Sequence, residues 1–282
     1  MAVRNFNEET LTAEVLRRIE GTPNPRLKEV MTSFIKHLHS FVREVRPTPD
    51  EWLTGIQFLT ETGHWSDDKR QEFILMSDTL GVSMLVDFLN YQARAGMTES
   101  TVQGPFHRPN APEYALGANV AKDPPDGEPC VVRGTIRSAD GKPVAGAALD
   151  IWETGDHGYD VQKGDAMDLR GIFRTDAEGK FWFRCVKPVS YPVPADGPVG
   201  KMLTATGRHP MRPAHLHFMI SAPGYERLVT HIFVKGDKYL DSDAVFGVKE
   251  SLIVDFKKNA AGEWEVSYDF VLKPSKQAKM AA

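Results

Sequence analysis

The spacing of apolar residues changes near Gly96, and this change constrains the fold more than any other feature of the sequence. Before it, apolar residues recur every three or four positions, in one stripe from Leu27 to Val42 and another from Ile74 to Leu89. That spacing is typical of amphipathic helices. After it, short apolar runs alternate with clusters of Pro, Gly and Asp, which is typical of strands joined by turns. The sequence therefore predicts two regions of different secondary structure.

The start of one helix is marked by its own residues. Thr48 is followed by Pro49 and, three positions after the threonine, by Glu51. A threonine with a glutamate three residues later forms a capping box, and proline is favoured at the first helical position. We therefore expect a helix that begins at Pro49.

The second region contains many short strands and no interleaved helical stripes. Residues 173–175 and 181–183 flank a turn at 176–179 and predict a hairpin. Short strands at this spacing favour an antiparallel β-sandwich. The expected fold class is α+β, mainly β, with a helical domain over residues 1–103 and a β-sandwich domain over residues 104–282. The other strands are expected at 131–136, 147–152, 215–220, 229–234, 251–256 and 264–271.

Composition excludes several classes of function. The 282 residues are 41% hydrophobic and 26% charged, with a net charge of −4, so no basic surface for nucleic acid or anionic membrane is expected. The sequence contains no run of eighteen apolar residues, so no membrane span is expected. The N-terminus lacks the apolar core of a signal peptide, so a cytoplasmic location is expected. Cys130 and Cys185 are too far apart in the sequence for a zinc knuckle or a redox pair.

His215 and His217 are the strongest local signal for chemistry. They lie two residues apart on an expected strand, so both imidazoles project from the same face. Two nitrogen donors on a rigid strand make half of a metal site. The spacing by itself is equally compatible with ordinary strand histidines.

The remaining metal ligands must come from other segments. Acidic residues such as Glu153 or Asp156 would indicate a ferrous or zinc site. Tyr159 and Tyr191 lie in loops, and phenolate oxygens are hard donors that favour a trivalent cation. A loop tyrosine taken alone is more commonly a half-buried side chain with a hydrogen-bonded hydroxyl.

The order of these motifs resembles that of the intradiol ring-cleavage dioxygenases. A tyrosine follows the second strand, then come a Tyr-Pro-X-Pro segment at Tyr191 and an Arg-Pro-Ala-His-X-His-Phe segment from Arg212 to Phe218. The resemblance extends over most of the chain, including the helical region. It is greatest to the hydroxyquinol-cleaving branch of the family, in residues 98–106, 159–162, 207–210 and 239–251.

The resemblance implies a metal site. One iron(III) per subunit would be held by Tyr159, Tyr191, His215 and His217. Tyr191 would leave the metal when the substrate binds and would then act as a base. The fixed charge of Arg212 would stabilise negative charge on the ring carbon that dioxygen attacks.

The resemblance also implies a substrate slot. Asp78 is of particular interest, because its carboxylate would accept a hydrogen bond from a third ring hydroxyl, although capping or solvating its helix is nearly as good an explanation. His231 stands where relatives that prefer catechol often carry glutamine, and it would contact the metal ligands or the substrate. The slot residues implied are Leu75, Asp78, Val102, Gly104, Pro105, Phe106, Val193, Pro194, His231 and Val245.

Three functions are compared on this basis. The first is cleavage of hydroxyquinol (1,2,4-trihydroxybenzene) between its ortho hydroxyls, giving 3-hydroxy-cis,cis-muconate or maleylacetate. The second is the same reaction on catechol or a chlorocatechol. The third is a metal-free, transthyretin-like binding module, suggested by the turn from Gly141 to Gly146 and the strand after it. The family resemblance also implies a homodimer formed through the helical domains, often around bound phospholipid.

Overall fold

The structure is a computed structural model that describes residues 4–67, 70–91, 96–122, 127–154 and 167–275. The chain divides into two compact units, Met1–Thr60 and Glu61–Ala282. The domain boundary predicted after residue 103 stays a prediction. Within the described residues, no helix has both the length and the apolar character needed to cross a membrane.

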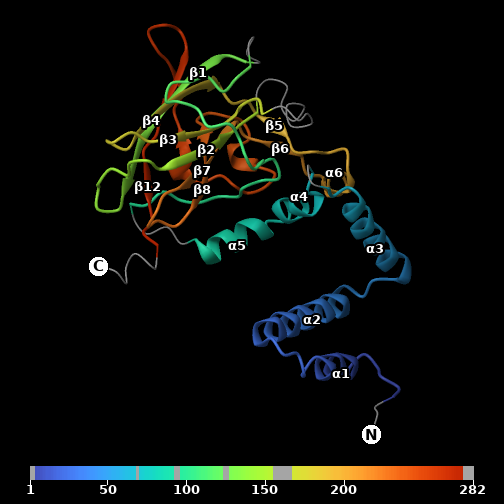
Figure 1. Cartoon of the computed structure of the whole chain (residues 1–282). Helices are drawn as coiled ribbons and strands as arrows, with labels where there is room; N and C mark the ends of the chain where they lie inside the picture. The colour runs from blue at the N-terminus through green and yellow to red at the C-terminus, as the bar shows by residue number, and fades with distance from the viewer. Residues whose placement is uncertain (1–3, 68–69, 92–95, 123–126, 155–166, 276–282) are drawn as a thin grey trace. The chain divides into compact units, whose positions relative to one another are not determined.

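The smaller unit is helical, as predicted (Figure 1). It contains α1 (Leu11–Arg18), α2 (Pro25–Val45) and most of α3 (Pro49–His64). The predicted capping box is present at the start of α3. The Thr48 backbone N–H donates to the Glu51 carboxylate at 2.7 Å, and the Glu51 N–H donates to the Thr48 hydroxyl at 3.3 Å. The helix therefore begins at Pro49 because both orphan donors are satisfied there.

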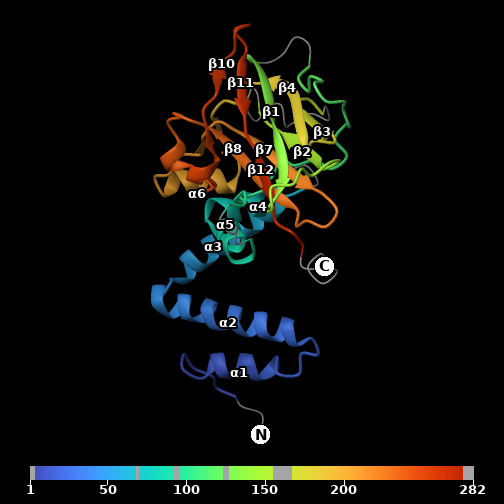
Figure 2. The ribbon, with the colours of Figure 1, turned by 90° about the vertical axis from the view of Figure 1, so that its left-hand side faces the viewer.

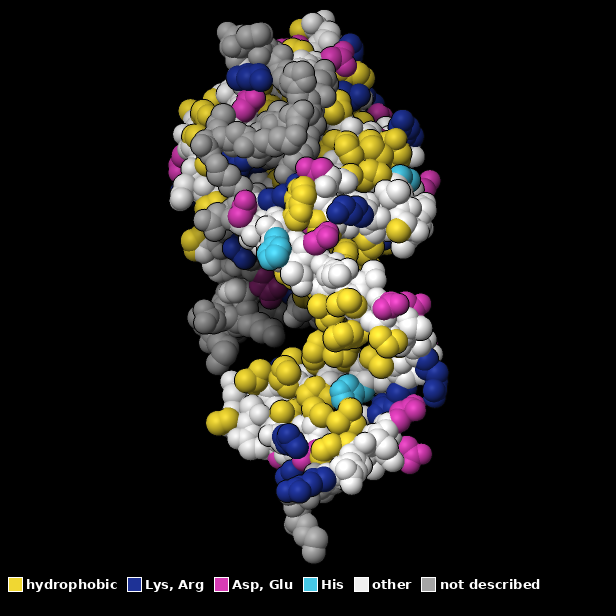
Figure 3. All heavy atoms as spheres, turned by 90° about the vertical axis from the view of Figure 1, so that its right-hand side faces the viewer, with side chains coloured by type: hydrophobic (Ala, Val, Ile, Leu, Met, Phe, Trp, Pro, Cys, Tyr) yellow, Lys and Arg dark blue, Asp and Glu magenta, His cyan; other side chains and the backbone are white. Residues whose placement is uncertain are grey.

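The helices of this unit bury very little apolar surface. Ile35 is the buried residue of the 21-residue helix α2. The large apolar side chains of α2 and of the first part of α3 are instead exposed, and hydrophobic side chains gather on this unit in Figure 3. They include Leu27, Val30, Phe34, Leu38, Phe41, Val42, Val45, Trp52, Ile56 and Leu59.

The larger unit begins with two short helices and contains a third. The apolar stripe from Ile74 to Leu89 forms α4 (Glu72–Thr79) and α5 (Val82–Asn90), rather than one helix. The break lies at Gly81, whose φ of 74° is a left-handed conformation that glycine adopts without strain. Helix α6 (Pro198–Ala205) was not predicted, although Pro198 at its first position is a common start signal. The helices α4 and α5 lie below the strands in both ribbon views (Figures 1 and 2).

Two five-stranded sheets form the rest of this unit, and a two-stranded pair accompanies them. The first sheet has the order β10-β11-β1-β12, with β4 also paired to β1, and the second has the order β3-β2-β7-β8-β9. The first sheet contains β1 (Pro129–Ser138), β4 (Lys180–Val186), β10 (Lys257–Lys258), β11 (Trp264–Ser267) and β12 (Phe270–Leu272). The second contains β2 (Ala148–Trp152), β3 (Arg170–Arg174), β7 (His215–Ser221), β8 (Leu228–Val234) and β9 (Ile253–Val254). The short pair is β5 (Tyr191–Pro192) with β6 (Met211–Arg212).

The two sheets enclose a single hydrophobic core. Alternate residues of each strand point into it, for example Phe181 and Phe183 of β4, and Leu216 and Phe218 of β7. Phe181 and Phe218 meet across the sheets with ring centroids 6.3 Å apart. The predicted sandwich with a helical N-terminal region is therefore confirmed.

Two details differ from the sequence prediction. The sheets are mixed, because β1 pairs in parallel with β11 and β12, and β8 pairs in parallel with β9. The hairpin predicted around residues 176–179 is wrong, because β3 and β4 belong to different sheets. The turn itself is present, and Asp176 accepts hydrogen bonds from the backbone of Glu178 and Lys180. A turn motif shows where the chain reverses, but the core decides which sheet each strand joins.

The face of the second sheet that points away from the core carries the three histidines predicted to belong to the site. Its register places Arg170, Trp152, His217 and His231 in one row across β3, β2, β7 and β8. His215 lies two residues from His217 on the same face.

Candidate metal centre

His215 and His217 come together as their spacing predicts. Both side chains are buried, and their Nε2 atoms lie 3.0 Å apart. The His215 Nδ1 lies 2.7 Å from the Pro213 carbonyl oxygen. Because a carbonyl only accepts, Nδ1 carries the proton and Nε2 presents a lone pair.

His231 adds a third imidazole from the neighbouring strand. It is directly opposite His217 in the β7–β8 register, and the two ring centroids are 4.0 Å apart. One donor atom from each of His215, His217 and His231 lies within 4.8 Å of the other two. The sequence pointed to His231 only through the family resemblance. The physical signal is that it faces the same side of the sheet as the other two histidines.

Tyr191 reaches the same place from the short pair β5–β6. Its hydroxyl lies 3.3 Å from the His215 Nε2, and its side chain is buried. Tyr191 is opposite Arg212 in the pair, so one short ladder carries two of the predicted site residues. Tyr159 lies outside the described residues, and its place in the ligand set stays a prediction.

Arg212 is enclosed by these groups and by an aspartate that the sequence analysis did not single out. Its Nη1 lies 3.0 Å from the His215 Nε2, and its Nε donates to Asp243 at 3.0 Å. The Asp243 carboxylate is buried with it. A buried arginine requires a buried partner, but the sequence does not show which acidic residue supplies it.

Burial sets the protonation of the imidazoles. It lowers the pKa of His215 and of His217 well below the usual 6.5, and the charge of Arg212 contributes to both decreases. The histidines are therefore neutral near pH 7, which is the form that binds metal. Burial also raises the pKa of the Tyr191 phenol above 10, and the charge of Arg212 offsets part of the increase. Neutral nitrogens and a phenol oxygen that converge in a buried space fit a bound cation.

An aromatic ring orients His217. Trp152 stacks on its imidazole with centroids 4.6 Å apart and an interplanar angle of 17°. No hydrogen-bond partner of the His217 Nδ1 lies among the described residues. Gly104 passes close on another side, where an added Cβ would stand 3.5 Å from the His217 Cε1. The ring is thus held mainly by packing.

Several of the predicted slot residues belong to two buried apolar clusters of the larger unit. Leu75, Val102, Val193 and Val245 belong to one buried apolar cluster. Phe106 belongs to another with Trp152 and Tyr191. Gly104 and Pro105 precede Phe106, and Pro194 follows Val193 in the chain. With His231 on β8, the residues predicted for the slot come from helix α4 and from four other segments of the larger unit.

Asp78, which is predicted to line the slot, is a buried carboxylate on helix α4. Burial raises its pKa from 3.8 to about 6, while a hydrogen bond from Ser83 and the charge of Arg212 lower it. One oxygen, Oδ2, has no hydrogen-bond partner among the described residues. A buried acceptor without a partner is costly for folding alone and is available to a ligand.

Comparison with known proteins gives consistent similarities. The sequence matches the family models "Catechol dioxygenase N terminus" over residues 24–98 and "Dioxygenase" over residues 102–274. It is 53% identical to 6-chlorohydroxyquinol 1,2-dioxygenase of Cupriavidus pinatubonensis, covering 97% of this chain and 100% of the relative. It is 50% identical to hydroxyquinol 1,2-dioxygenase of a Rhizobium species, covering 95% and 96%. The crystal structure of hydroxyquinol 1,2-dioxygenase from Pseudomonas putida superposes with a TM-score of 0.86 at 46% identity, covering 95% of this chain and 99% of that one.

The raised pKa of Asp78 predicts a pH-dependent effect of the substitution Asp78→Asn on stability. Between about pH 4 and pH 6 the unfolded chain has lost the Asp78 proton and the folded protein retains it, so this group makes stability fall as pH rises. The asparagine of the variant would not titrate. Relative to the wild type, the variant should gain up to about 3 kcal/mol in free energy of unfolding from pH 4 to pH 7.5.

Urea unfolding of chelator-treated protein at both pH values measures this gain. Asp241→Asn, which removes a carboxylate at an exposed position, is the matched control. An Asp78→Asn difference that is the same at both pH values would contradict the assignment.

Proposed function

This chain belongs to the intradiol ring-cleavage dioxygenases, and from that premise we propose that it cleaves hydroxyquinol between its two ortho hydroxyls with dioxygen. The observation that carries the substrate is the 46–53% identity to relatives named for hydroxyquinol or its 6-chloro derivative, over nearly the whole chain. Identity is lower to catechol 1,2-dioxygenase of Candida albicans, at 38%, and to catechol 1,2-dioxygenase from Pseudomonas arvilla C-1, at 29%. We do not propose a metal-free binding module, because the matching family models and relatives are those of dioxygenases. The expected cytoplasmic location stays a prediction.

The proposed cofactor is one iron(III) per subunit, held by Tyr159, Tyr191, His215 and His217. The support is the convergence of Tyr191, His215 and His217 in one buried space, with imidazoles that burial keeps neutral. Two phenolates and two imidazoles are a hard donor set that suits a trivalent cation and leaves the site positive. Such a site would accept a dianionic diol. When bound, the iron(III) would supply the Lewis-acid chemistry that makes the diol ring reactive toward dioxygen.

Tyr191 is the proposed base. Its hydroxyl adjoins His215 in a space closed to solvent, and its segment is stiffened by Pro192 and Pro194. A phenolate released there would take the proton of a substrate hydroxyl. Tyr159, His215 and His217 would keep their places.

Arg212 and His231 complete the polar side of the site. The guanidinium of Arg212 is buried beside His215, where a fixed positive charge acts in a low-dielectric space. It would stabilise negative charge that develops on the ring carbon. The His231 Nδ1 lies 3.5 Å from the Arg212 Nη2. His231 would help to hold the substrate and Arg212 in place.

Asp78 is the proposed selector for the third hydroxyl. Its Oδ2 would accept the hydrogen bond that hydroxyquinol alone can donate. With catechol the buried acceptor would stay without a partner, which disfavours that substrate. The apolar residues Leu75, Val102 and Val245 would pack on the ring and exclude water.

The ligand set predicts a visible spectrum. Iron-loaded protein should be coloured by charge transfer from tyrosinate to iron(III), and Tyr159→Phe or Tyr191→Phe should shift or weaken the band. Tyr114→Phe is the matched control, because this residue stacks on Phe173 away from the site and should leave the band unchanged. Colourless protein that stays inactive after iron reconstitution would contradict the proposal.

The role of Asp78 predicts a change in substrate preference. Asp78→Asn should lower kcat/KM for hydroxyquinol about 10- to 100-fold and change kcat/KM for catechol much less, since a hydrogen bond to a charged buried group is worth about 1.5–3 kcal/mol. Steady-state rates on hydroxyquinol, catechol and a chlorocatechol measure the ratio. Wild-type protein that is indifferent to the third hydroxyl would exclude hydroxyquinol as the preferred substrate.

The helical unit is the proposed site of homodimer formation around a phospholipid. The support is its exposed apolar surface and a hollow of about 980 Å³ within this unit. Leu11, Leu38, Phe41, Trp52 and Leu59 are among the residues that line the hollow. A surface this apolar on one unit is typical of an interface or of a site for acyl chains.

Phe41→Asp should therefore weaken the dimer, because a charge would be buried in an apolar interface. The neighbouring Ser40→Asp places the same charge on an exposed polar position of α2 and should leave the mass unchanged. Light scattering measures the mass, and mass spectrometry of an organic extract detects the lipid. A monomeric, lipid-free wild type would exclude this assembly.

A further inference from the structure

The orientation of Arg212 is set by Asp243. The Nε of Arg212 donates to one carboxylate oxygen at 3.0 Å, and its Nη2 donates to the other at 3.3 Å. This two-point contact fixes the plane of the guanidinium, which a single contact would not. The Nη1 group is then left pointing at the His215 Nε2, 3.0 Å away.

Asp243 also organises the loop of residues 243–247. Its carboxylate accepts the backbone N–H of Val245 at 3.3 Å and that of Gly247 at 3.0 Å. The loop thus folds around the same carboxylate that holds Arg212. Val245, whose side chain belongs to the apolar wall of the slot, is carried by this loop.

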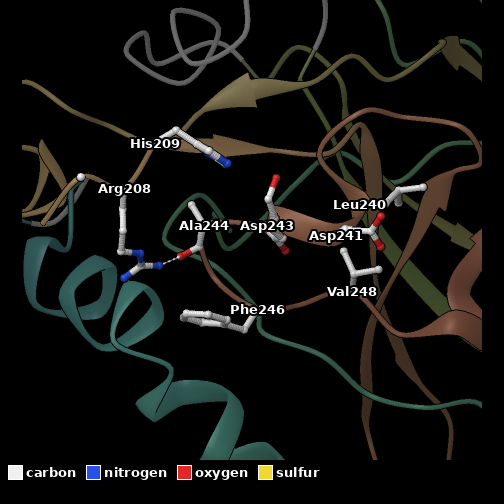
Figure 4. Close-up of a pocket in the computed structure, with 10 residues that line it drawn as sticks. Arg208, His209, Leu240, Asp241, Asp243, Ala244, Phe246 and Val248 are labelled. Atoms are coloured by element: carbon white, nitrogen blue, oxygen red, sulfur yellow. Dashed lines mark hydrogen bonds between the residues drawn. The ribbon is translucent and has the colours of Figure 1, made fainter.

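The other side of the loop is held by separate contacts. The Arg208 guanidinium donates to the Ala244 carbonyl at 2.9 Å, beside a hollow of about 540 Å³ (Figure 4). The Thr101 hydroxyl donates to the Gly247 carbonyl at 2.7 Å. Asp243 is therefore not needed merely to keep the loop attached to the unit.

Gly247 shows how closely the loop approaches the ion pair. A Cβ added there would stand 3.0 Å from the Thr101 Oγ1, 3.1 Å from the Arg212 Nη2 and 3.2 Å from the Asp243 Oδ2. All three distances are tighter than ordinary contact. An alanine at this position would therefore press on the ion pair and on Thr101 without changing a charge.

We propose that Asp243 is a positioning residue: it fixes the orientation of the Arg212 guanidinium beside His215, where the reacting ring would bind, and it links that orientation to the loop that carries Val245. The inference rests on the proposed function, since it takes Arg212 to stabilise charge on the ring. An asparagine at position 243 would remove the negative charge and one of the two acceptor oxygens, so two contacts would no longer fix the plane of the guanidinium. The substitution should therefore lower the rate of the chemical step and leave substrate binding nearly unchanged.

The test compares Asp243→Asn with wild-type holoenzyme on whichever diol the wild type turns over fastest. We expect kcat to fall about 10- to 100-fold, as for other groups that orient a site residue, with KM changed less than about threefold. Anaerobic titration with the same diol, followed in the visible band, should give an unchanged dissociation constant. Metal analysis should give an unchanged iron content. Asp241→Asn, an exposed change two residues away, is the control and should match the wild type.

Two further variants separate positioning from general damage. In an Arg212→Ala background, Asp243→Asn should add less than a twofold loss of kcat, because the residue it aims is already gone. Gly247→Ala should also lower kcat while changing KM little, and it alters no charge. If Asp243→Asn does not fold, Gly247→Ala becomes the test of the positioning role. A kcat within twofold of wild type, a loss confined to KM, or equal losses with and without Arg212 would each overturn the inference. A wild type that does not prefer hydroxyquinol counts only against the proposed substrate.

Discussion

Strand β7 is buried on both of its faces, and the other elements of the larger unit cover these two faces. One face, through Leu216, Phe218 and Ile220, fills the space between the sheets. The other face must also be closed to water, yet it carries His215 and His217. Burial makes a charged imidazole unfavourable, so these histidines are neutral and present lone pairs. The same exclusion of water that stabilises the sandwich thus prepares its opposite face to bind a cation.

The opposite face needs its own covering layer, and that layer is the site. Trp152 stacks on His217, Tyr191 closes over His215, and the Arg212–Asp243 pair fills the space beside them. These side chains come from β2, β5, β6 and the loop after β8. Each is buried because the others are present, which is why the polar groups pair with one another rather than with water.

Periodicity in the sequence predicted the parts of the fold that depend on neighbouring residues. The capping box at Thr48, the helical stripes and the strand carrying His215 follow from local spacing, and each is formed. The hairpin at residues 176–179 failed because strand partners are chosen by the core, not by the turn between them. The parallel pairing of β1 with β11 and β12 joins segments more than 120 residues apart, which no local pattern reveals.

The residues of the candidate site likewise divide into those that local spacing predicts and those that depend on long-range contacts. Alternation along the strand brought His215 and His217 together, whereas Tyr191 could be assigned only through family resemblance, because its approach depends on the β5–β6 pairing. Asp243 was missed altogether. It lies 31 positions from Arg212, and only the folded chain brings the two charges together. Long-range ion pairs leave no spacing rule in a single sequence.

The slot and the metal centre are carried by different parts of the catalytic unit. The histidines belong to the central strands of a sheet, where a change of side chain disturbs two packed faces at once. Leu75 and Asp78 belong to α4, a helix of 8 residues at the margin of the sandwich. Both side chains are buried, so substitutions on that helix would change the packing around the proposed slot while the strands that carry the donor nitrogens stay in place. In the proposed site, the residues that would choose the ring can therefore change separately from those that would hold the metal.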